Sequence, residues 1–284
     1  MKTGIVITTH GNNGIYIKRC IESFLKYVEN DKYIVVFINE SSDPITLNCM
    51  KIFKSSVHFI YINDQKKNGG LTGTWNAGIS LCIKKNCETI ILSNDDLVVN
   101  NSVNEIIKYT QISQKKKILN YFGPVSNNPG VGIGNRENQY AINLTHRKGE
   151  NIFIAKHPKT KKPSMLNGFF LSFPVHVLVN NFYSKPIQSN EDKNLSDTIY
   201  FNPDYPFGGN EVEWFDRFSK KFNGKGIVIP QCFVFHHKLK TWRSHVNAKG
   251  RSGKDIRGKD RSVIKLKPKS KSLEIKRFTN LILN

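Results

Sequence analysis

The chain has 284 residues, of which 38% are hydrophobic, and it contains 18 Phe and 10 Tyr. This composition excludes a disordered protein, and the length allows one large domain or two intimate ones. No apolar run approaches the roughly 20 residues that a membrane-spanning helix needs. Only about five apolar residues precede polar ones at the N-terminus, so we expect a first strand there and no signal peptide.

The cysteines are five in number and scattered, and no two of them form a Cys-x-x-Cys pair. They are Cys20, Cys49, Cys82, Cys87 and Cys232. This pattern favours reduced thiols in a cytoplasmic protein and argues against a zinc site.

The formal net charge is +21, which by itself suggests a polyanionic partner such as nucleic acid. From Lys238 to Asn284, however, 15 Lys and Arg stand against three acids, so +12 of this charge lies in the last 47 residues. Trp242 and Phe278 are the aromatic residues among these cations, whereas binders of single strands interleave aromatic and basic side chains. A basic tail also suits an anionic membrane surface.

The first hundred residues alternate between apolar, β-rich runs and stretches with helical spacing. We expect strands at 4–9, 33–38, 57–62 and 89–92, helices at 15–28, 45–54 and 75–83, and a loop at 63–73. Strands that alternate with helices predict a parallel sheet in a nucleotide-binding α/β arrangement. A flavodoxin-like or other doubly wound fold has the same pattern.

The pattern is less regular after Asn100. We expect helices at 103–110, 175–179 and 211–218, and strands at 164–173, 226–230 and 232–235. The segments 119–160 and 183–206 lack a clear pattern and are expected to supply substrate-side loops. Gly130-Val-Gly-Ile-Gly134 resembles a dinucleotide loop only superficially, because it follows a proline and not a strand.

Three adjacent polar residues, Asn94-Asp95-Asp96, end the fourth predicted strand. Two neighbouring carboxylates repel each other and lose solvation when buried, so their position needs a reason. One reason is a turn with a helix N-cap, since Asn and Asp accept hydrogen bonds from free amide groups. The other is a divalent cation held by oxygen ligands at the carboxyl end of a strand.

Three further groups of residues could carry chemistry. Small residues in 68–78 would let a backbone approach phosphates or a ribose, although simple turn geometry also explains them. Glu211 and Glu213 do not share a helix face, so they should differ in role, one as a general base and the other as a cap or a partner of Arg217. His236-His237 follows an apolar strand. A histidine at this position could bind a metal ion, or it could be a core residue whose hydrogen bonds are satisfied.

The order of these groups resembles the GT-A fold glycosyltransferases, specifically the inverting family 2-like enzymes, over residues 3–242. The resemblance implies an α/β fold of the nucleotide-diphospho-sugar transferase type, with a mostly parallel central sheet flanked by helices. It implies one domain at 1–242, divided into a nucleotide-binding half (1–100) and an acceptor half (101–242). Residues 243–284 would be a basic tail with a short helix at 272–283.

The resemblance also implies roles for individual residues. Asp96 and His236 would bind a Mn²⁺ or Mg²⁺ ion that bridges the donor diphosphate, and Glu211 would be the catalytic base. Asn94 stands where the family has the leading Asp of its Asp-x-Asp motif, and Asn39 stands where it has an Asp that contacts the base. Other donor contacts are expected from Thr8, Thr9, Gly69, Gly70, Asn76, Asn94 and Asp95.

The expected activity is metal-dependent, inverting transfer of a sugar from a nucleotide-diphosphate donor, with a UDP-sugar favoured. The acceptor would be a hydroxyl on a glycan, a lipid or a protein. The expected location is the cytoplasm, with peripheral contact to an anionic membrane through the tail. The alternatives are a nucleic-acid- or polyanion-binding protein and a catalytically degenerate transferase-like protein. A nucleotidyltransferase would favour a Lys or Arg in an N-terminal Gly loop, and 10–14 carries none.

Overall fold

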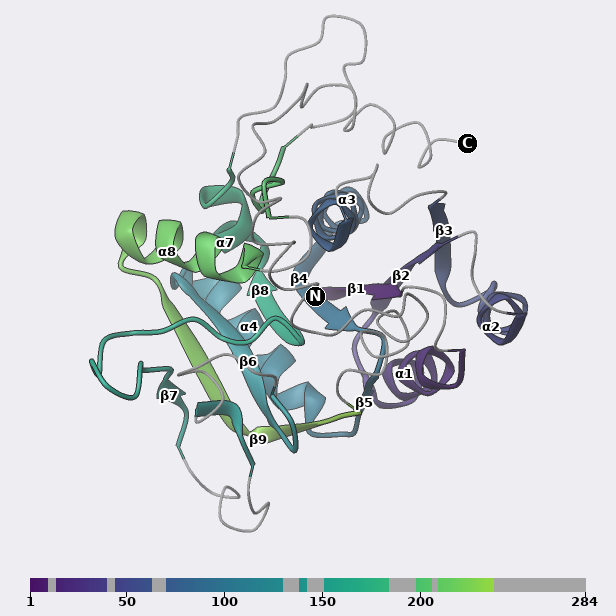
Figure 1. Cartoon of the computed structure of the whole chain (residues 1–284), viewed down its shortest axis with the longest axis horizontal. Helices are drawn as coiled ribbons and strands as arrows, with labels where there is room; N and C mark the ends of the chain where they lie inside the picture. The colour runs from purple at the N-terminus through teal and green to yellow at the C-terminus, as the bar shows by residue number, and fades with distance from the viewer. Residues whose placement is uncertain are drawn as a thin grey trace, which may run out of the picture.

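The computed structural model contains a mixed nine-stranded sheet with helices packed against it (Figure 1). The sheet order is β3-β2-β1-β4-β8-β6-β9-β5, and β7 pairs with β9 beside this path. The structure describes residues 1–9, 14–39, 44–62, 70–129, 138–141, 151–183, 198–205 and 209–237.

The first half of the chain forms four parallel strands and the helices that connect them. These elements are β1 (Lys2–Thr9), α1 (Gly14–Tyr27), β2 (Lys32–Asn39), α2 (Pro44–Phe53), β3 (His58–Ile62), α3 (Gly70–Lys84) and β4 (Cys87–Asn94). β1 lies between β2 and β4, and Thr8 of β1 is paired in register with Asn94 of β4. Since parallel strands end at the same edge of a sheet, the polar ends of β1 and β4 are neighbours. The prediction of a parallel α/β half is confirmed.

The second half adds both antiparallel and parallel pairs to the same sheet. Its elements are β5 (Leu97–Val99), α4 (Val103–Lys116), β6 (Asn120–Ser126), β7 (Phe153–Ile154), β8 (Phe170–Pro174), α7 (Val175–Asn180), α8 (Asn210–Phe222) and β9 (Lys225–His236). β8 runs antiparallel to β4, and β9 runs parallel to β6 and antiparallel to β5. In Figure 1, β9 extends from the end of α8 to β5. It therefore carries the chain back from α8 to the turn that follows β4.

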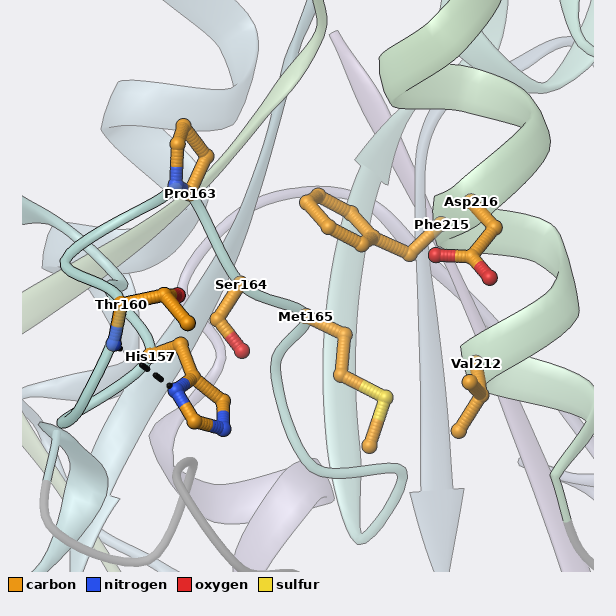
Figure 2. Close-up of a pocket in the computed structure, with 8 residues that line it drawn as sticks. All are labelled: His157, Thr160, Pro163, Ser164, Met165, Val212, Phe215 and Asp216. Carbon is orange, nitrogen blue, oxygen red and sulfur yellow. Dashed lines mark hydrogen bonds between the residues drawn. The ribbon is translucent and has the colours of Figure 1, made fainter.

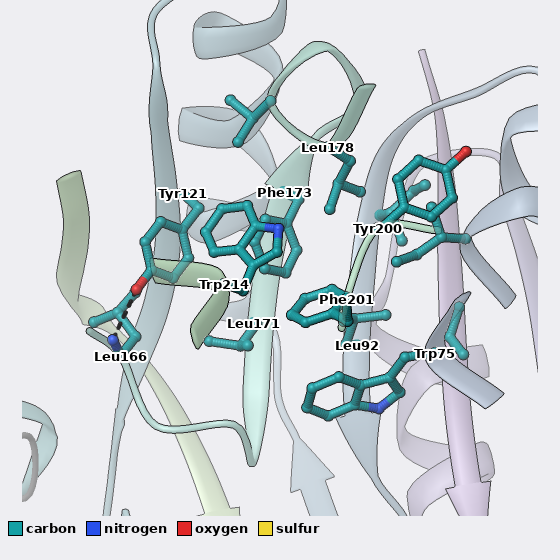
Figure 3. Packing of buried hydrophobic residues seen from close by; sticks show 14 of the residues in the cluster. Trp75, Leu92, Tyr121, Leu166, Leu171, Phe173, Leu178, Tyr200, Phe201 and Trp214 are labelled. Atoms are coloured by element: carbon teal, nitrogen blue, oxygen red, sulfur yellow. Dashed lines mark hydrogen bonds between the residues drawn. The ribbon is translucent and has the colours of Figure 1, made fainter. Parts of the chain in front are cut away.

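Two apolar clusters cover the two faces of the sheet, as the alternation of side chains along a strand requires. In β1, Ile5 and Ile7 pack with α1 and α4, whereas Val6 packs with α3. The cluster on the α3 side is rich in aromatic rings, and Figure 3 shows Trp214 of α8 close to Tyr121 and Phe173. These rings hold α8, which carries a predicted catalytic residue, firmly against the sheet.

A glycine allows α3 to approach β1 very closely. A Cβ atom at Gly78 would lie 2.4 Å from Val6 Cγ1, so a larger residue there would push α3 away from the sheet. The same helix begins at Gly70 with a φ of 61°, a left-handed conformation that glycine adopts at little cost. The prediction of a loop through residue 73 is wrong at this point, because α3 already includes 70–73.

Other predictions also differ from the structure. The strand expected at 164–173 begins only at Phe170, as β8, and 164–169 are not part of a strand. The sequence does not predict β6, because Gly123 and Pro124 interrupt its apolar run, and both residue types are depleted in strands. Its pairing with β9 shifts register between Pro124 and Val125. The two strands predicted at 226–230 and 232–235 are one strand, β9, with Pro230 within it. In the described part of the chain, no helix combines the length and the apolar character that a membrane span requires.

Candidate active site

The carboxyl ends of β1 and β4 are joined by a short hydrogen bond. Thr9 Oγ1 donates to Asp95 Oδ2 over 2.5 Å, and both residues are buried. One residue earlier, the Thr8 hydroxyl lies 2.9 Å from the Thr74 hydroxyl of α3. Three of the residues predicted to contact the donor are therefore anchored at one edge of the sheet: Thr8, Thr9 and Asp95.

The two adjacent carboxylates lie in a turn between two strands. β4 ends at Asn94 and β5 begins at Leu97, so Asp95 and Asp96 make the connection. The next helix, α4, begins only at Val103, and its N-cap residue is Ser102. The helix N-cap alternative for these carboxylates is therefore wrong.

Asp96 faces His236, the last residue of β9. His236 Nε2 lies 3.2 Å from Asp96 Oδ1, and the two side chains are only 6% and 5% exposed. The other ring nitrogen, Nδ1, lies 2.6 Å from the carbonyl oxygen of Asn128, which can only accept a hydrogen bond. A proton on Nδ1 satisfies that contact and leaves a lone pair on Nε2. The lone pair of His236 Nε2 then faces the carboxylate oxygen Oδ1 of Asp96. This arrangement is favourable only with a proton or a cation between the two atoms.

Backbone and ring contacts hold His236 in this position. The amide side chain of Asn127 accepts a hydrogen bond from His236 N over 2.8 Å and donates one to His236 O over 3.2 Å. The Phe169 ring stacks on the imidazole with 5.2 Å between centroids. His237 N donates to the Asp96 carbonyl, and the His237 ring contacts Tyr16 and Phe235. Three residues around His236 are not predictable as site residues from the sequence: Asn127, Asn128 and Phe169.

Asp96 and His236 fit a divalent cation of the kind that shares its coordination with a substrate. Carboxylate oxygen and imidazole nitrogen are both ligands for such ions. Within the described ranges, no group of three or more His, Cys, Asp and Glu side chains could enclose a metal ion by itself. Mg²⁺ sites commonly use one or two carboxylates, with substrate phosphates and water completing the octahedron. The backbone acceptor on Nδ1 of His236 is also typical of metal-binding histidines.

Glu211 lies in the first turn of α8. Its N–H donates to the side-chain oxygen of Asn210, whose amide nitrogen donates to Thr72 Oγ1 in α3. Gly168 lies against the carboxyl group, because a Cβ there would be 3.4 Å from Glu211 Cδ. Burial raises the pKa of Glu211, and the hydrogen bond from its own backbone N–H lowers it to a smaller extent. A carboxylate with a raised pKa is a better proton acceptor near neutral pH.

Glu213 pairs with a cation, as the sequence predicts for one of the two glutamates. It forms an ion pair with Arg217, with 3.1 Å between Arg217 Nε and Glu213 Oε1. The same guanidinium donates to the carbonyl oxygens of Asn181 and Tyr200. Glu213 therefore orients an arginine that ties α8 to two other segments.

Asn76 holds two separate segments together. Its side-chain oxygen accepts from the backbone N–H groups of Tyr200 and Phe201, and its nitrogen donates to Phe201 O over 2.9 Å. These bonds attach α3 to residues 198–205 and leave one amide hydrogen of Asn76 for another partner. Gly69 and the side chain of Asn39 lie outside the described part of the chain.

The Gly168–Phe169 dipeptide connects the two parts of the site. Gly168 packs on the Glu211 carboxyl group, and Phe169 stacks on the His236 ring. Phe169 O also accepts a hydrogen bond from Asn94 N at the end of β4. Consecutive Cα atoms are 3.8 Å apart, so the Asp96–His236 pair and Glu211 flank one short stretch of backbone.

Comparison with known proteins identifies the class to which this fold belongs. Crystal structures of S. aureus TarS 1–349 with UDP and of GalNAc-T7 with UDP, GalNAc and Mn²⁺ share the fold, with TM-scores of 0.53 and 0.56. The sequence identities are 12% and 14%, over 83% and 99% of this chain. The matches span 60% and 54% of those two chains. The fold is thus the GT-A fold, as predicted.

The family follows from the sequence itself. The model of glycosyl transferase family 2 matches residues 4–161, which is more than half of the chain. The chain belongs to this family, and its fold is that of a glycosyltransferase. A search of the curated proteins found no match.

Proposed function

We propose that this protein transfers a sugar from a nucleotide-diphosphate donor to a hydroxyl group, with a divalent cation and with inversion at the anomeric carbon. The observation that carries the proposal is the arrangement around Gly168 and Phe169. A convergent carboxylate–imidazole pair lies on one side, and a glutamate whose pKa is raised lies on the other. These are the two groups that such a transfer requires, a cation site for the leaving diphosphate and a base for the acceptor.

Asp96 and His236 would hold the cation, either Mn²⁺ or Mg²⁺. When bound, such an ion neutralises the negative charge that develops on the departing diphosphate. GalNAc-T7, which shares the fold, was crystallised with UDP and Mn²⁺, and this supports the choice of ion. Asn127, Asn128 and Phe169 would hold His236 in place for this role.

Glu211 would act as the general base. Its carboxylate takes the proton of the acceptor hydroxyl while the hydroxyl oxygen forms a bond to the anomeric carbon. The bond from that carbon to the diphosphate oxygen breaks, and the leaving nucleoside diphosphate keeps the electron pair. Proton removal of this kind accelerates reactions by about 10²–10⁴-fold. Because there is a single displacement, the anomeric configuration inverts.

The polar ends of β1 and β4 would contact the donor. Thr8, Thr9, Asn94 and Asp95 are close together there, and Gly70 begins the neighbouring helix. A UDP-sugar is the favoured donor, because the TarS and GalNAc-T7 structures that share the fold contain UDP. Asn39, Gly69 and Asn76 remain further proposed donor contacts. The acceptor is a hydroxyl on a glycan, a lipid or a protein.

Calorimetric titration of the full chain with UDP, ADP and GDP, each with and without Mn²⁺, tests this proposal. We expect UDP to bind in the presence of Mn²⁺ and to bind far more weakly without it. The incubation of UDP-sugars with Mn²⁺ should also release UDP slowly, as water replaces the acceptor. If none of the three nucleotides binds under either condition, the proposed function is wrong.

We also propose that residues 1–242 form the transferase domain and that 243–284 form a separate basic tail. The tail lies outside the described part of the chain. Contact with an anionic membrane through it therefore remains a prediction from charge alone. The polyanion-binding alternative is a prediction of the same kind. The Asp96–His236 pair and Glu211 weigh against a degenerate protein, because the proposed reaction needs both.

A further inference from the structure

A pocket of about 260 Å³ lies between α8 and a hairpin formed by residues 155–164. Figure 2 shows His157, Thr160 and Met165 on one side and Val212, Phe215 and Asp216 of α8 on the other. The volume lies just below the usual range for drug-sized ligands, which is about 300–1,000 Å³. A single sugar ring with one substituent would suit it better than an extended nucleotide.

The hairpin wall is ordered by its own hydrogen bonds. Ser164 N donates to Ala155 O, and His157 N donates to Lys162 O. At the tip, His157 Nδ1 accepts from the backbone N–H groups of Lys159 and Thr160. A ring nitrogen that accepts hydrogen bonds carries no proton, so the proton of the neutral ring is on Nε2. The imidazole of His157 therefore presents a single N–H donor to the pocket.

Both walls of the pocket lead to the proposed base. Phe215 lies one helical turn after Glu211 on α8, and residues four apart share a helix face. On the other wall, Met165 stands three residues before Gly168, which packs on the Glu211 carboxyl group. Both walls of the pocket therefore belong to segments that also carry or contact Glu211.

The chemistry of the lining suits a saccharide. Met165, Val212 and Phe215 provide an apolar surface for the C–H face of a sugar ring. His157 Nε2–H, the Ser164 hydroxyl and the Asp216 carboxylate can pair with sugar hydroxyl groups. Pockets of this type, with an apolar surface and a few polar groups, bind small molecules with a defined orientation.

The charge beside the pocket points to an anionic saccharide. Lys159, Lys161 and Lys162 alternate with the lining residues of the hairpin, and all three are exposed. Among the described residues, none of the three ammonium groups forms an ion pair. Three cations at the rim would attract an anionic group and raise its rate of association.

We propose that this pocket binds the acceptor and that the acceptor is a saccharide bearing a phosphate or carboxylate group. This inference rests on the proposed glycosyl transfer, because it assigns the acceptor side of the same site. The apolar residues hold the ring, His157 and Asp216 orient its hydroxyl groups, and the lysines at the rim contact the anionic substituent.

The test uses four probes with the full chain: glucose 6-phosphate, glucuronic acid, glucose and inorganic phosphate. Binding is measured by saturation-transfer NMR and calorimetry. We expect both anionic sugars to bind more tightly than glucose or inorganic phosphate. The two anionic sugars also distinguish a phosphate-bearing acceptor from a carboxylate-bearing one. If inorganic phosphate and glucose 6-phosphate bound with equal affinity, the site would recognise the anion and not the sugar. The proposal would then be wrong.

Matched variants locate the binding. Val212→Trp places a large side chain in the pocket, at a residue that is 41% exposed. Its control is Val179→Trp on α7, where the residue is 45% exposed. Lys159→Glu with Lys162→Glu reverses the charge of the rim, and Lys115→Glu with Lys116→Glu makes the same change on α4. We expect both pocket variants to bind glucose 6-phosphate at least about fivefold more weakly than their controls. Equal affinities in each pair would overturn the inference.

Titration with UDP and Mn²⁺ separates this inference from the proposed function. Pocket variants and controls should all bind UDP like the wild type, because no lining residue belongs to the donor site. If UDP binds but the variants do not alter sugar binding, the acceptor pocket is wrong and the proposed function stands. If anionic sugars bind in the pocket but no nucleotide binds, the pocket is supported and the proposed function fails.

Discussion

His236 Nε2 lies 3.2 Å from Asp96 Oδ1, and the opposite ring nitrogen is held by the carbonyl of Asn128. The two residues reach each other because β9 pairs with β5, which places Leu97 opposite His236. Burial removes most of the water that would otherwise separate the lone pair from the carboxylate. The pair can therefore share a cation, and this role can be tested directly.

Asp96→Ala should abolish the dependence of UDP binding on Mn²⁺. The loss of a residue that only orients a metal ligand typically costs 10–100-fold in affinity, so the loss of a ligand itself should cost at least about 100-fold. Calorimetric titration of UDP, with and without Mn²⁺, provides the measurement. Asp31→Ala is the control, since its side chain is 72% exposed at the far end of β1. Identical Mn²⁺-dependent binding by Asp96→Ala and the wild type would remove Asp96 from the metal site.

Glu211→Gln should bind the donor but lose turnover. The amide has nearly the same size and shape but cannot accept the proton, so we expect a loss of about 10²–10⁴-fold in kcat with UDP binding unchanged. Glu213→Gln is the control from the same helix turn. It should lose stability with its Arg217 contact while keeping most of the turnover. Turnover that survives in Glu211→Gln would exclude Glu211 as the base.

The raised pKa of Glu211 has opposite consequences for activity and stability. As a base it must be ionised, so kcat should fall as the pH decreases through a midpoint above 4.5, the ordinary glutamate value. For folding, the favourable contribution of the protonated form is complete below 4.5 and is lost as the pH rises through the raised pKa. Glu211→Gln should therefore have a Tm at pH 7 equal to or above that of the wild type. A clearly lower Tm would indicate that the ionised carboxylate has a favourable partner.

Much of the first half of the fold can be predicted from sequence, whereas the surroundings of His236 cannot. Buried parallel strands read as continuous apolar runs, so β1, β2 and β4 are recognisable from their residues alone. Asn127 and Asn128 follow β6, a strand that Gly123 and Pro124 conceal. Their contacts with His236 depend on the pairing of β6 with β9, which is set by tertiary structure. Asn127 and Asn128 therefore leave no pattern in the sequence. Phe169 lies inside the strand expected at 164–173, but nothing in that apolar run indicates its contact with His236.

Asn76→Ala should mainly reduce stability. Its three hydrogen bonds tie α3 to Tyr200 and Phe201, and their loss leaves backbone groups without partners. We expect the free energy of unfolding to fall by about 2–4 kcal/mol, measured by urea denaturation. Asn104→Ala also removes three side-chain hydrogen bonds, but at a more exposed position where water can replace them. Its effect should be smaller. An unchanged free energy of unfolding would show that these bonds do not stabilise the attachment of α3, whereas a loss of UDP affinity beside the loss of stability would support the proposed donor contact of Asn76.

Gly168→Ala should slow the reaction without affecting donor binding. The added Cβ would lie 3.3 Å from Trp75 Cη2, which must give way slightly, and 3.4 Å from Glu211 Cδ, in van der Waals contact with the carboxyl group. A displacement of about 1 Å in a catalytic group can cost about 100-fold in rate, so we expect this smaller readjustment beside Glu211 to lower kcat by about 3–10-fold. The control is Gly226→Ala, whose Cβ would lie 3.0 Å from Leu166 Cγ and crowd the core instead of Glu211. This control should lower Tm more than Gly168→Ala and reduce kcat less. If both variants lost turnover only in proportion to their loss of stability, Gly168 would have no part in positioning the base.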